Sequence, residues 1–101
     1  MPVDIEAPIK VEQEDIDLGG TSRYRDPVGR AMHRAGYLNP DTQDDHVFFR
    51  LEPRGWAYMG LLPDEAQEFL KRFDAGETVE PFEFHLFDVE IEPAAEEAAT
   101  Q

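Results

Sequence analysis

Apolar and polar residues alternate between positions 9 and 18, near the start of the chain. This alternation is typical of a strand with one buried face, because successive side chains of a strand point to opposite sides. The segment ends at Gly19 and Gly20, a pair that favours a turn. The pattern therefore predicts a first strand over residues 9–18.

A longer alternation occupies residues 82–91, and its apolar residues change phase between Leu86 and Phe87. A change of phase requires either a β-bulge or a strand that leaves one sheet surface for another. The pattern therefore predicts a last strand with this irregularity near its centre.

Two other segments carry apolar residues at helical spacing. The first begins at Asp26-Pro27, an N-cap residue followed by proline at the first helical position, and it ends before Gly36. The second begins at Pro63, with acidic residues in its first turn and basic residues in its last, and it ends before Gly76. The spacing predicts two helices, over residues 27–35 and 63–75.

A loop and a hairpin are expected between these helices. Residues 37–45 contain Asn-Pro and three aspartates, which is typical of a loop. Two alternating runs then flank a turn that contains Pro53 and Gly55, and together they predict a β-hairpin. We expect the hairpin aromatics to lie in the core, because a small domain needs its large side chains inside; an exposed aromatic platform is the alternative. These residues are Phe48, Trp56 and Tyr58.

The expected element order is β-α-β-β-α-β, which is the order of the ferredoxin-like split βαβ sandwich. We expect a small α+β domain whose antiparallel sheet carries two helices on one face; a sheet of three or four antiparallel strands with other connections is the alternative. The 101 residues fit a single domain. Residues 1–8 and 93–101 lack a hydrophobic pattern, so we expect flexible termini there.

The composition restricts the compartment and the chemistry. The chain has no cysteine, which excludes disulfides, thiolate metal sites and cysteine nucleophiles. No stretch approaches the roughly 20 apolar residues that cross a bilayer, and the N-terminus does not resemble a signal peptide. We therefore expect a cytoplasmic protein.

The chain carries 23 acidic and 9 basic residues, a formal net charge of −14. A field of this sign repels phosphate backbones and anionic lipids, so we expect no direct contact with nucleic acid or membrane. Residues 1–20 hold six acids and one base, and nine acids follow Arg72, the last basic residue. Residues 21–55 hold six arginines and five acids, so an arginine-bearing middle lies between two anionic segments.

The arginines around the start of the first predicted helix form one candidate interaction site. They surround a tyrosine, and clustered arginine and tyrosine are typical of binding hot spots. The alternative is that these arginines pair with acids of the first and last strands. The residues of this site are Arg23, Tyr24, Arg25, Arg30 and Arg34.

The last predicted strand forms a second candidate surface. Its aromatic run is long enough to pair with a second copy through an exposed edge, so the pattern is compatible with a homodimer. Its acidic residues limit uncontrolled pairing and extend the anionic surface. They are Glu83, Asp88, Glu90 and Glu92.

We find no motif for catalysis, a metal or a cofactor. His33, His46 and His85 have no metal-ligand spacing, although the predicted sheet leaves an approach of His46 to His85 open. Gly19-Gly20 lacks the spacing and the lysine of a phosphate-binding loop, and no base with an orienting partner lies close to Ser22 in the sequence. We therefore expect a protein without catalysis, cofactor or metal.

Four segments resemble a family of small uncharacterised phage and actinobacterial proteins. They are IKVEQEDI at residues 9–16, P-V-x-x-A-x-x-x-A-G at 27–36, L-P-x-E-A-x-E-F-x-x-x-F-D-x-G at 62–76 and V-x-P-F-x-F at 79–84. The resemblance extends over about three-quarters of the chain. Asp26 stands where a cysteine is expected before the proline of the first helix. The resemblance implies a phage or mobile-element origin and an accessory role, and it implies no activity.

The acidity favours a binding module. We expect a small acidic accessory protein that docks on the basic surface of a partner protein, as a mimic of nucleic-acid charge or an inhibitor of a host protein. One alternative is a small-ligand-binding domain, with a pocket where Arg23, Arg25 and a histidine converge. Another is a structural homodimer, and the acidity is also compatible with a role in solubility alone.

Overall fold

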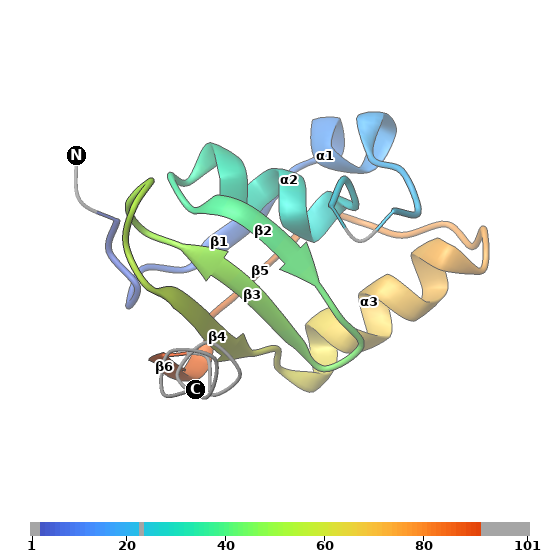
Figure 1. The fold of residues 1–101 in the computed structure, drawn as a ribbon. Helices are drawn as coiled ribbons and strands as arrows, with labels where there is room; N and C mark the ends of the chain where they lie inside the picture. Colours follow the sequence, from blue (N-terminus) through green and yellow to red (C-terminus); the bar gives the residue numbers. More distant parts are fainter. Residues whose placement is uncertain (1–2, 23, 92–101) are drawn as a thin grey trace.

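The computed structural model describes residues 3–22 and 24–91, and Figure 1 shows the fold. These residues form three helices and six strands. In chain order the elements are β1 (Ile9–Val11), α1 (Gln13–Leu18), α2 (Pro27–Arg34), β2 (Leu38–Thr42), β3 (His46–Arg50), β4 (Ala57–Leu61), α3 (Asp64–Asp74), β5 (Phe82–Phe84) and β6 (Phe87–Ile91). The α+β class expected from the sequence is confirmed. No described helix is long and apolar enough to span a membrane.

The described strands form two antiparallel sheets. The larger sheet has the order β2-β3-β4-β6, and β1 pairs with β5 in a separate two-stranded ribbon. In Figure 1 this ribbon and α2 lie behind the larger sheet. The expected order β-α-β-β-α-β is corrected, because α1 and β2 are additional elements and the last alternation forms two strands. The ferredoxin-like sheet is corrected as well, because β1 pairs only with β5 among the described strands.

The second half of the first predicted strand is the helix α1. Asp15, at the third position of this helix, accepts a hydrogen bond of 2.8 Å from the backbone N–H of Glu12. This capping box satisfies a donor that a helix start otherwise leaves open. The local helix signal outweighs the alternation of Ile16 and Leu18, and Leu18 is consequently exposed.

The predicted loop contains the edge strand β2. Asn39 has a φ of 51°, and the register between β2 and β3 shifts between Leu38 and Asp41. The Asn-Pro pair therefore belongs to a bulge, and Pro40 stands at a sheet edge, where a missing N–H is tolerated. Asp-rich, Pro-containing sequence is compatible with a strand in this position.

The last alternation is divided between the two sheets. β5 belongs to the ribbon and β6 to the four-stranded sheet, so the change of phase marks a passage between sheets, as one of the two sequence explanations requires. Asp88 has a φ of 50°, and the pairing of β4 with β6 shifts register between Met59 and Leu61. A bulge is therefore present as well.

The two helices and the hairpin predicted from local patterns are present as α2, α3 and β3-β4. The carboxylate of Asp26 accepts a hydrogen bond of 2.7 Å from the N–H of Gly29, and Pro27 occupies the first turn of α2. Lys71 and Arg72 lie in the last turn of α3. These elements agree with the sequence because their signals are complete within each segment.

The core lies between the four-stranded sheet on one side and the helices with the ribbon on the other. Buried side chains of all these parts meet in one cluster, which includes Met32 of α2, Phe49 of β3 and Leu70 of α3. The ring of Phe49 meets Tyr37 edge-on, with centroids 5.0 Å apart, and stacks on Tyr58 at 5.9 Å.

The hairpin aromatics lie in three different environments, which corrects the expectation that all are in the core. Tyr58 points inward and packs against the core. Phe48 is half-buried on the opposite face, since its neighbour Phe49 points inward. Trp56 lies in the turn before β4 and is 54% exposed.

Residues 3–8, expected to be a flexible terminus, contain a side chain that packs against the core, Val3. The backbone N–H of Ala7 donates a hydrogen bond of 3.1 Å to the carbonyl oxygen of Asp4, which closes a turn. The other expected flexible segment, residues 93–101, lies outside the described residues.

Candidate functional site

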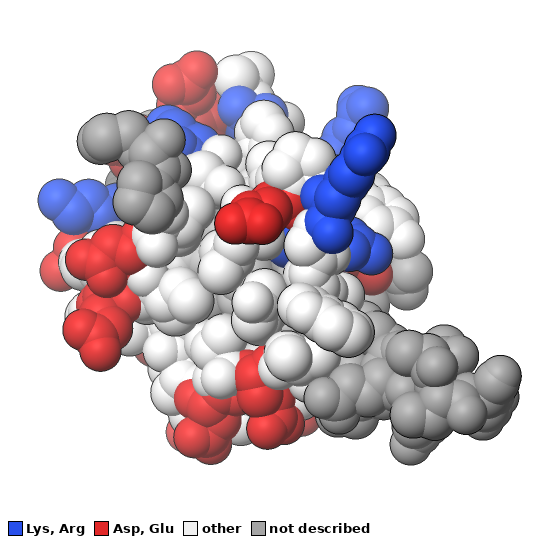
Figure 2. All heavy atoms as spheres, turned by 60° about the vertical axis from the view of Figure 1, so that its left-hand side comes forward, with Lys and Arg blue, Asp and Glu red and all other residues white. Residues whose placement is uncertain are grey.

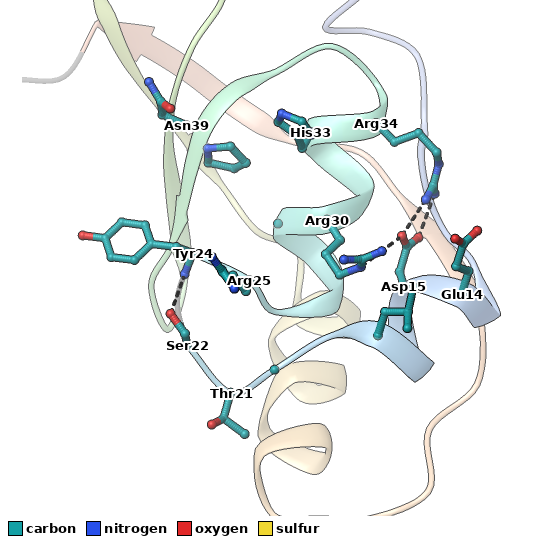
Figure 3. Close-up of a pocket in the computed structure, with 14 residues that line it drawn as sticks. Glu14, Asp15, Thr21, Ser22, Tyr24, Arg25, Arg30, His33, Arg34 and Asn39 are labelled. Atoms are coloured by element: carbon teal, nitrogen blue, oxygen red, sulfur yellow. Dashed lines mark hydrogen bonds and ion pairs between the residues drawn. The ribbon is translucent and has the colours of Figure 1, made fainter.

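A large hollow lies between α1, the connection to α2, α2 itself and the start of β2 (Figure 3). Its volume is about 1280 Å³, which exceeds that of a typical small-ligand pocket. Four residues of the candidate arginine site line this hollow. They are Tyr24, Arg25, Arg30 and Arg34. The fifth, Arg23, lies outside the described residues.

The helix α2 supplies most of the charged wall. Arg30, His33 and Arg34 are three and four positions apart, so they lie on one side of the helix. The buried side chains Val28 and Met32 point to the core and fix the rotation of the helix. The N-cap fixes its start, and these local features place the three basic side chains beside the hollow.

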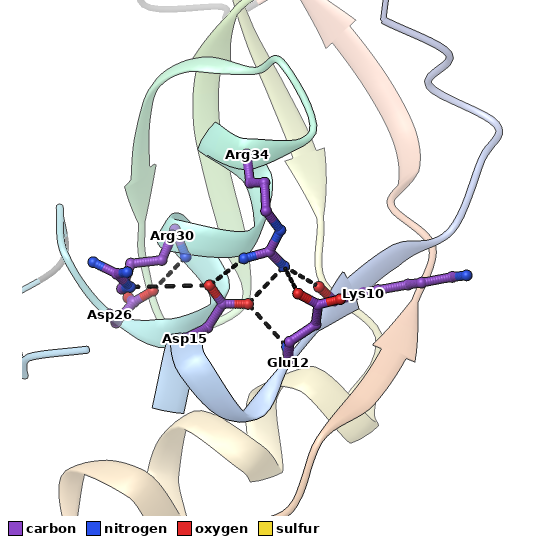
Figure 4. Close-up of polar contacts among 7 residues, drawn as sticks. Lys10, Glu12, Asp15, Asp26, Arg30 and Arg34 are labelled. Atoms are coloured by element: carbon purple, nitrogen blue, oxygen red, sulfur yellow. Dashed lines mark hydrogen bonds and ion pairs between the residues drawn. The ribbon is translucent and has the colours of Figure 1, made fainter. Parts of the chain in front are cut away.

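Arg34 joins α2 to α1 through an ion pair with Asp15 (Figure 4). Its two terminal nitrogens lie 2.5 Å and 2.7 Å from the two carboxylate oxygens, and one of them also donates to the carbonyl oxygen of Lys10 at 2.8 Å. The Asp15 side chain is 1% exposed and that of Arg34 is 42% exposed. For Arg34, the alternative that arginines pair with acids of the first predicted strand is therefore correct.

The ion pair also governs the protonation of Asp15. Burial by itself raises the pKa of this carboxyl, but hydrogen bonds from Arg34 and from the backbone of Glu12 outweigh burial and hold its pKa below the ordinary value. Asp15 is therefore a charged group at neutral pH whose charge is balanced by Arg34. The sequence pattern alone did not single out Asp15; its signal is the capping-box spacing after Glu12.

Arg30 is only partly committed to the same carboxylate. Its Nε lies 3.9 Å from the Asp15 Oδ1, which is an ion-pair distance but too long for a hydrogen bond. This Nε is buried and has no hydrogen-bond partner within the described residues, although the side chain as a whole is 34% exposed. Arg30 therefore keeps donor capacity that the described part of the chain leaves unused.

The connection before α2 brings Tyr24 and Arg25 to the mouth of the hollow. The N–H of Gly20 donates to the carbonyl oxygen of Arg25 at 2.9 Å, and the N–H of Arg25 donates to that of Ser22 at 3.0 Å. These bonds fold the connection into a compact turn. The side chains of Tyr24 and Arg25 are exposed there.

His33 completes the basic lining of the hollow. Its side chain is exposed, and neither His33 nor Arg25 has a side-chain partner within residues 3–22 and 24–91. Glu14 also lines the hollow, but Figure 3 shows it beside Asp15 and away from Arg25. The end formed by Arg25, Arg30 and His33 is thus the more basic one, and we call it the basic end. His33 could have been identified from its position three residues after Arg30.

The acidic residues of the second candidate surface do not gather in one place. Glu83 lies on β5 opposite Lys10, whereas Asp88 and Glu90 lie on β6 in the other sheet, and all three acids are exposed. Glu92 lies outside the described residues. Figure 2 shows that acidic side chains on one face of the molecule lie in several separate places, at the top, left and lower borders and in the centre, while basic ones lie in the upper half.

The described part of the chain contains no group of three or more His, Asp or Glu residues that could hold a metal ion. His46 lies beside Asp45, with its Nδ1 2.5 Å from a carboxylate oxygen. The basic end carries two guanidinium groups, which only donate hydrogen bonds and therefore suit an anion, together with a single imidazole.

No protein-family model matches the sequence, and searches of the curated proteins and of the solved structures found no match. The chemistry of the hollow is therefore the basis of the functional interpretation.

Proposed function

We propose that this protein is a non-catalytic binding module whose basic end receives the anionic group of a ligand. The observation that carries this proposal is the convergence of Arg25, Arg30 and His33 on one hollow in a chain with a net charge of −14 (Figure 3). The proposal follows the small-ligand alternative of the sequence analysis, in which a pocket combines arginine with a histidine.

Two features make the basic end suitable for a carboxylate or a phosphate group. A guanidinium presents its N–H donors as a planar fork that matches the oxygens of these anions. The side chain of Arg30 is 34% exposed and makes only a long ion pair with Asp15, so its guanidinium is not fully committed within the described residues. Asp15 does not cancel this attraction, because Arg34 already balances its charge.

The test is a titration with inorganic phosphate and phenyl phosphate, followed by amide chemical shifts and calorimetry. Arg25→Ala removes one charge-assisted hydrogen bond of about 1.5–3 kcal/mol, so we expect its affinity to fall by roughly tenfold or more. Arg54→Ala is the matched control, because it removes an equal charge from an exposed residue of the β3-β4 turn, outside the hollow. Equal losses in both variants would show a general charge effect and contradict the proposal.

A second candidate function, docking on a basic partner protein, is favoured by the exposure of the acids. Asp15 and Asp26 are the buried acids among the described residues, so nearly all of the negative charge there reaches solvent. Such a surface attracts basic partners over several ångströms and loses this attraction in salt. Mimicry of nucleic-acid charge and inhibition of a host protein are specific forms of this role.

A further inference from the structure

The four-stranded sheet has an inner face toward the core and an outer face away from it. Because Phe49 and Tyr58 point inward, the residues next to them on β3 and β4 point outward. Phe48 lies directly opposite Met59 on this outer face, and Leu61 lies opposite Phe87. The outer face therefore has an apolar centre formed by Phe48, Met59, Leu61 and Phe87.

This apolar centre is not part of the core. The half-buried side chains that pack against the core include Tyr58 and Val89, but they include none of the four residues of the apolar centre. Phe87 is 46% exposed. Figure 1 shows α2 behind the sheet and no described helix in front of it.

Carboxylates lie at both ends of the central row. The strand registers place Asp41 opposite Phe48, Phe48 opposite Met59, and Met59 opposite Glu90. The row therefore crosses all four strands, with an acid on each edge strand and apolar side chains between them. At about 4.8 Å per strand, the two edge strands are roughly 14 Å apart.

The two basic side chains on this face, those of Arg50 and His46, contact residues close to them in the chain. The guanidinium of Arg50 donates to the carbonyl oxygen of Gly55 in its own turn. The imidazole of His46 lies beside Asp45 and meets the ring of Phe48 edge-on at 4.9 Å. These contacts hold both side chains in place, although Arg50 keeps its positive charge. The groups at the two ends of the central row, Asp41 and Glu90, are both acidic, and Asp41 also accepts a hydrogen bond from the side chain of Gln43.

We propose that this outer face docks a basic amphipathic helix of a partner protein. The apolar stripe of the helix covers the apolar centre, and its lysines and arginines lie against Asp41 and Glu90. A helix with its side chains is about 10–12 Å wide, which fits between the two acidic edges. A second copy of this chain fits poorly, because it brings its own acids and a net charge of −14. The inference rests on the second candidate function and is independent of the basic end.

The test uses a synthetic helical peptide with leucines at positions i, i+3, i+4 and i+7 and lysines elsewhere. A peptide with glutamate in place of lysine is the control, and fluorescence anisotropy measures binding. We expect Phe48→Thr, which retains a strand-forming residue, to weaken binding of the lysine peptide by roughly tenfold or more. Glu90→Gln should weaken it less and lower its salt dependence, whereas Glu83→Gln, an equal charge loss on β5, should change neither.

Equal binding of both peptides, or unchanged binding by Phe48→Thr, would overturn the proposal. Circular dichroism and the phosphate titration confirm that each variant is folded and that the basic end is intact. Loss of peptide binding with phosphate binding retained separates the two sites. Self-association of the wild type that Phe48→Thr abolishes would show that a second copy covers the face, and it would overturn the proposed partner.

Discussion

Arg34 of α2 donates hydrogen bonds to both carboxylate oxygens of Asp15 in α1, although the two residues are 19 positions apart. Asp15 is almost fully buried and also accepts a hydrogen bond from the backbone N–H of Glu12. The same carboxylate therefore caps the start of α1 and connects this helix to α2 through the ion pair with Arg34. A helix of six residues is not stable alone and depends on such contacts. The wall of the hollow beside α1 therefore depends on this ion pair.

Removal of Arg34 should destabilise the protein more than removal of a neighbouring arginine. Arg34→Ala leaves a buried carboxylate without its ion-pair partner, and with a discount for the exposure of Arg34 we expect a loss of about 2 kcal/mol in urea unfolding. Arg25→Ala, which removes an exposed arginine, should lose less than about 0.5 kcal/mol. Equal losses would mean that the pair has no structural role.

The contribution of this pair should disappear in acid. The folded protein holds the pKa of Asp15 below its ordinary value of 3.8, because hydrogen bonds from Arg34 and Glu12 exceed the opposing effect of burial. A lowered pKa stabilises the folded state above the ordinary value, and this stabilisation is lost as the pH falls through the folded pKa. The difference in unfolding free energy between wild type and Arg34→Ala should therefore shrink below pH 3.8. A constant difference would contradict this explanation.

Asp26 should show the opposite dependence on pH. Burial raises its pKa from 3.8 to about 6, against the hydrogen bonds from Gly29 and Thr42, and Asp74 adds to the rise. A raised pKa means that the folded protein binds the proton more tightly. Stability therefore falls as the pH rises from the ordinary value through about 6, by up to about 3 kcal/mol.

Asp26→Asn tests this dependence, because asparagine is also a good N-cap. Relative to the wild type, the variant should gain stability between pH 4 and pH 7, the interval that contains both pKa values. Asp26→Ala is the control for the cap: it should be less stable than Asp26→Asn by about 1 kcal/mol at both pH values. Urea unfolding at the two pH values measures both effects. A difference between Asp26→Asn and wild type that does not change with pH would contradict the prediction.

The hydroxyl group of Tyr37 should contribute nothing to stability. It is buried and has no hydrogen-bond partner within the described residues, while the ring contacts Phe49. Tyr37→Phe keeps the ring and removes the unsatisfied hydroxyl, so we expect unchanged stability or a gain of up to about 1 kcal/mol. Tyr37→Ala, which also removes the ring, should lose about 3–5 kcal/mol. A loss above about 1 kcal/mol in Tyr37→Phe would show that the hydroxyl is hydrogen-bonded.

Two glycines with positive φ differ both in backbone conformation and in the space around an added Cβ. Gly36 and Gly76 follow the ends of α2 and α3 with φ values of 104° and 79°. A Cβ at Gly36 lies 3.0 Å from the Val3 Cγ2, whereas one at Gly76 meets nothing within 4 Å. Gly76→Ala should cost about 1 kcal/mol through the backbone alone. Gly36→Ala should cost more, because its φ lies farther from the left-handed helical region and because its Cβ meets Val3. Thermal unfolding compares the two, and equal losses would mean that neither the larger φ of Gly36 nor its contact with Val3 has a cost.

The elements that the sequence predicted correctly have all their signals within one segment. Asp26 and Pro27 start α2, Gly36 follows its end, and the turn with Pro53 and Gly55 joins the strands of the hairpin. The proximity of Tyr24, Arg25, Arg30 and Arg34 was predictable for the same reason, since one connection and one helix carry them. Local chemistry determined these features without reference to the rest of the chain.

Tertiary contacts decided the remaining features. β1 is a strand because β5 pairs with it, and β2 is a strand because β3 supplies a partner for a segment whose composition favours a loop. The ion pair with Asp15 decides that Arg34 is structural, whereas Arg25 stays open at the basic end. A local sequence pattern does not identify a strand partner or an ion-pair partner that is distant along the chain. The sequence by itself therefore determined α2, α3, the hairpin and the charge, and the packing of distant segments decided the sheets and the role of each arginine.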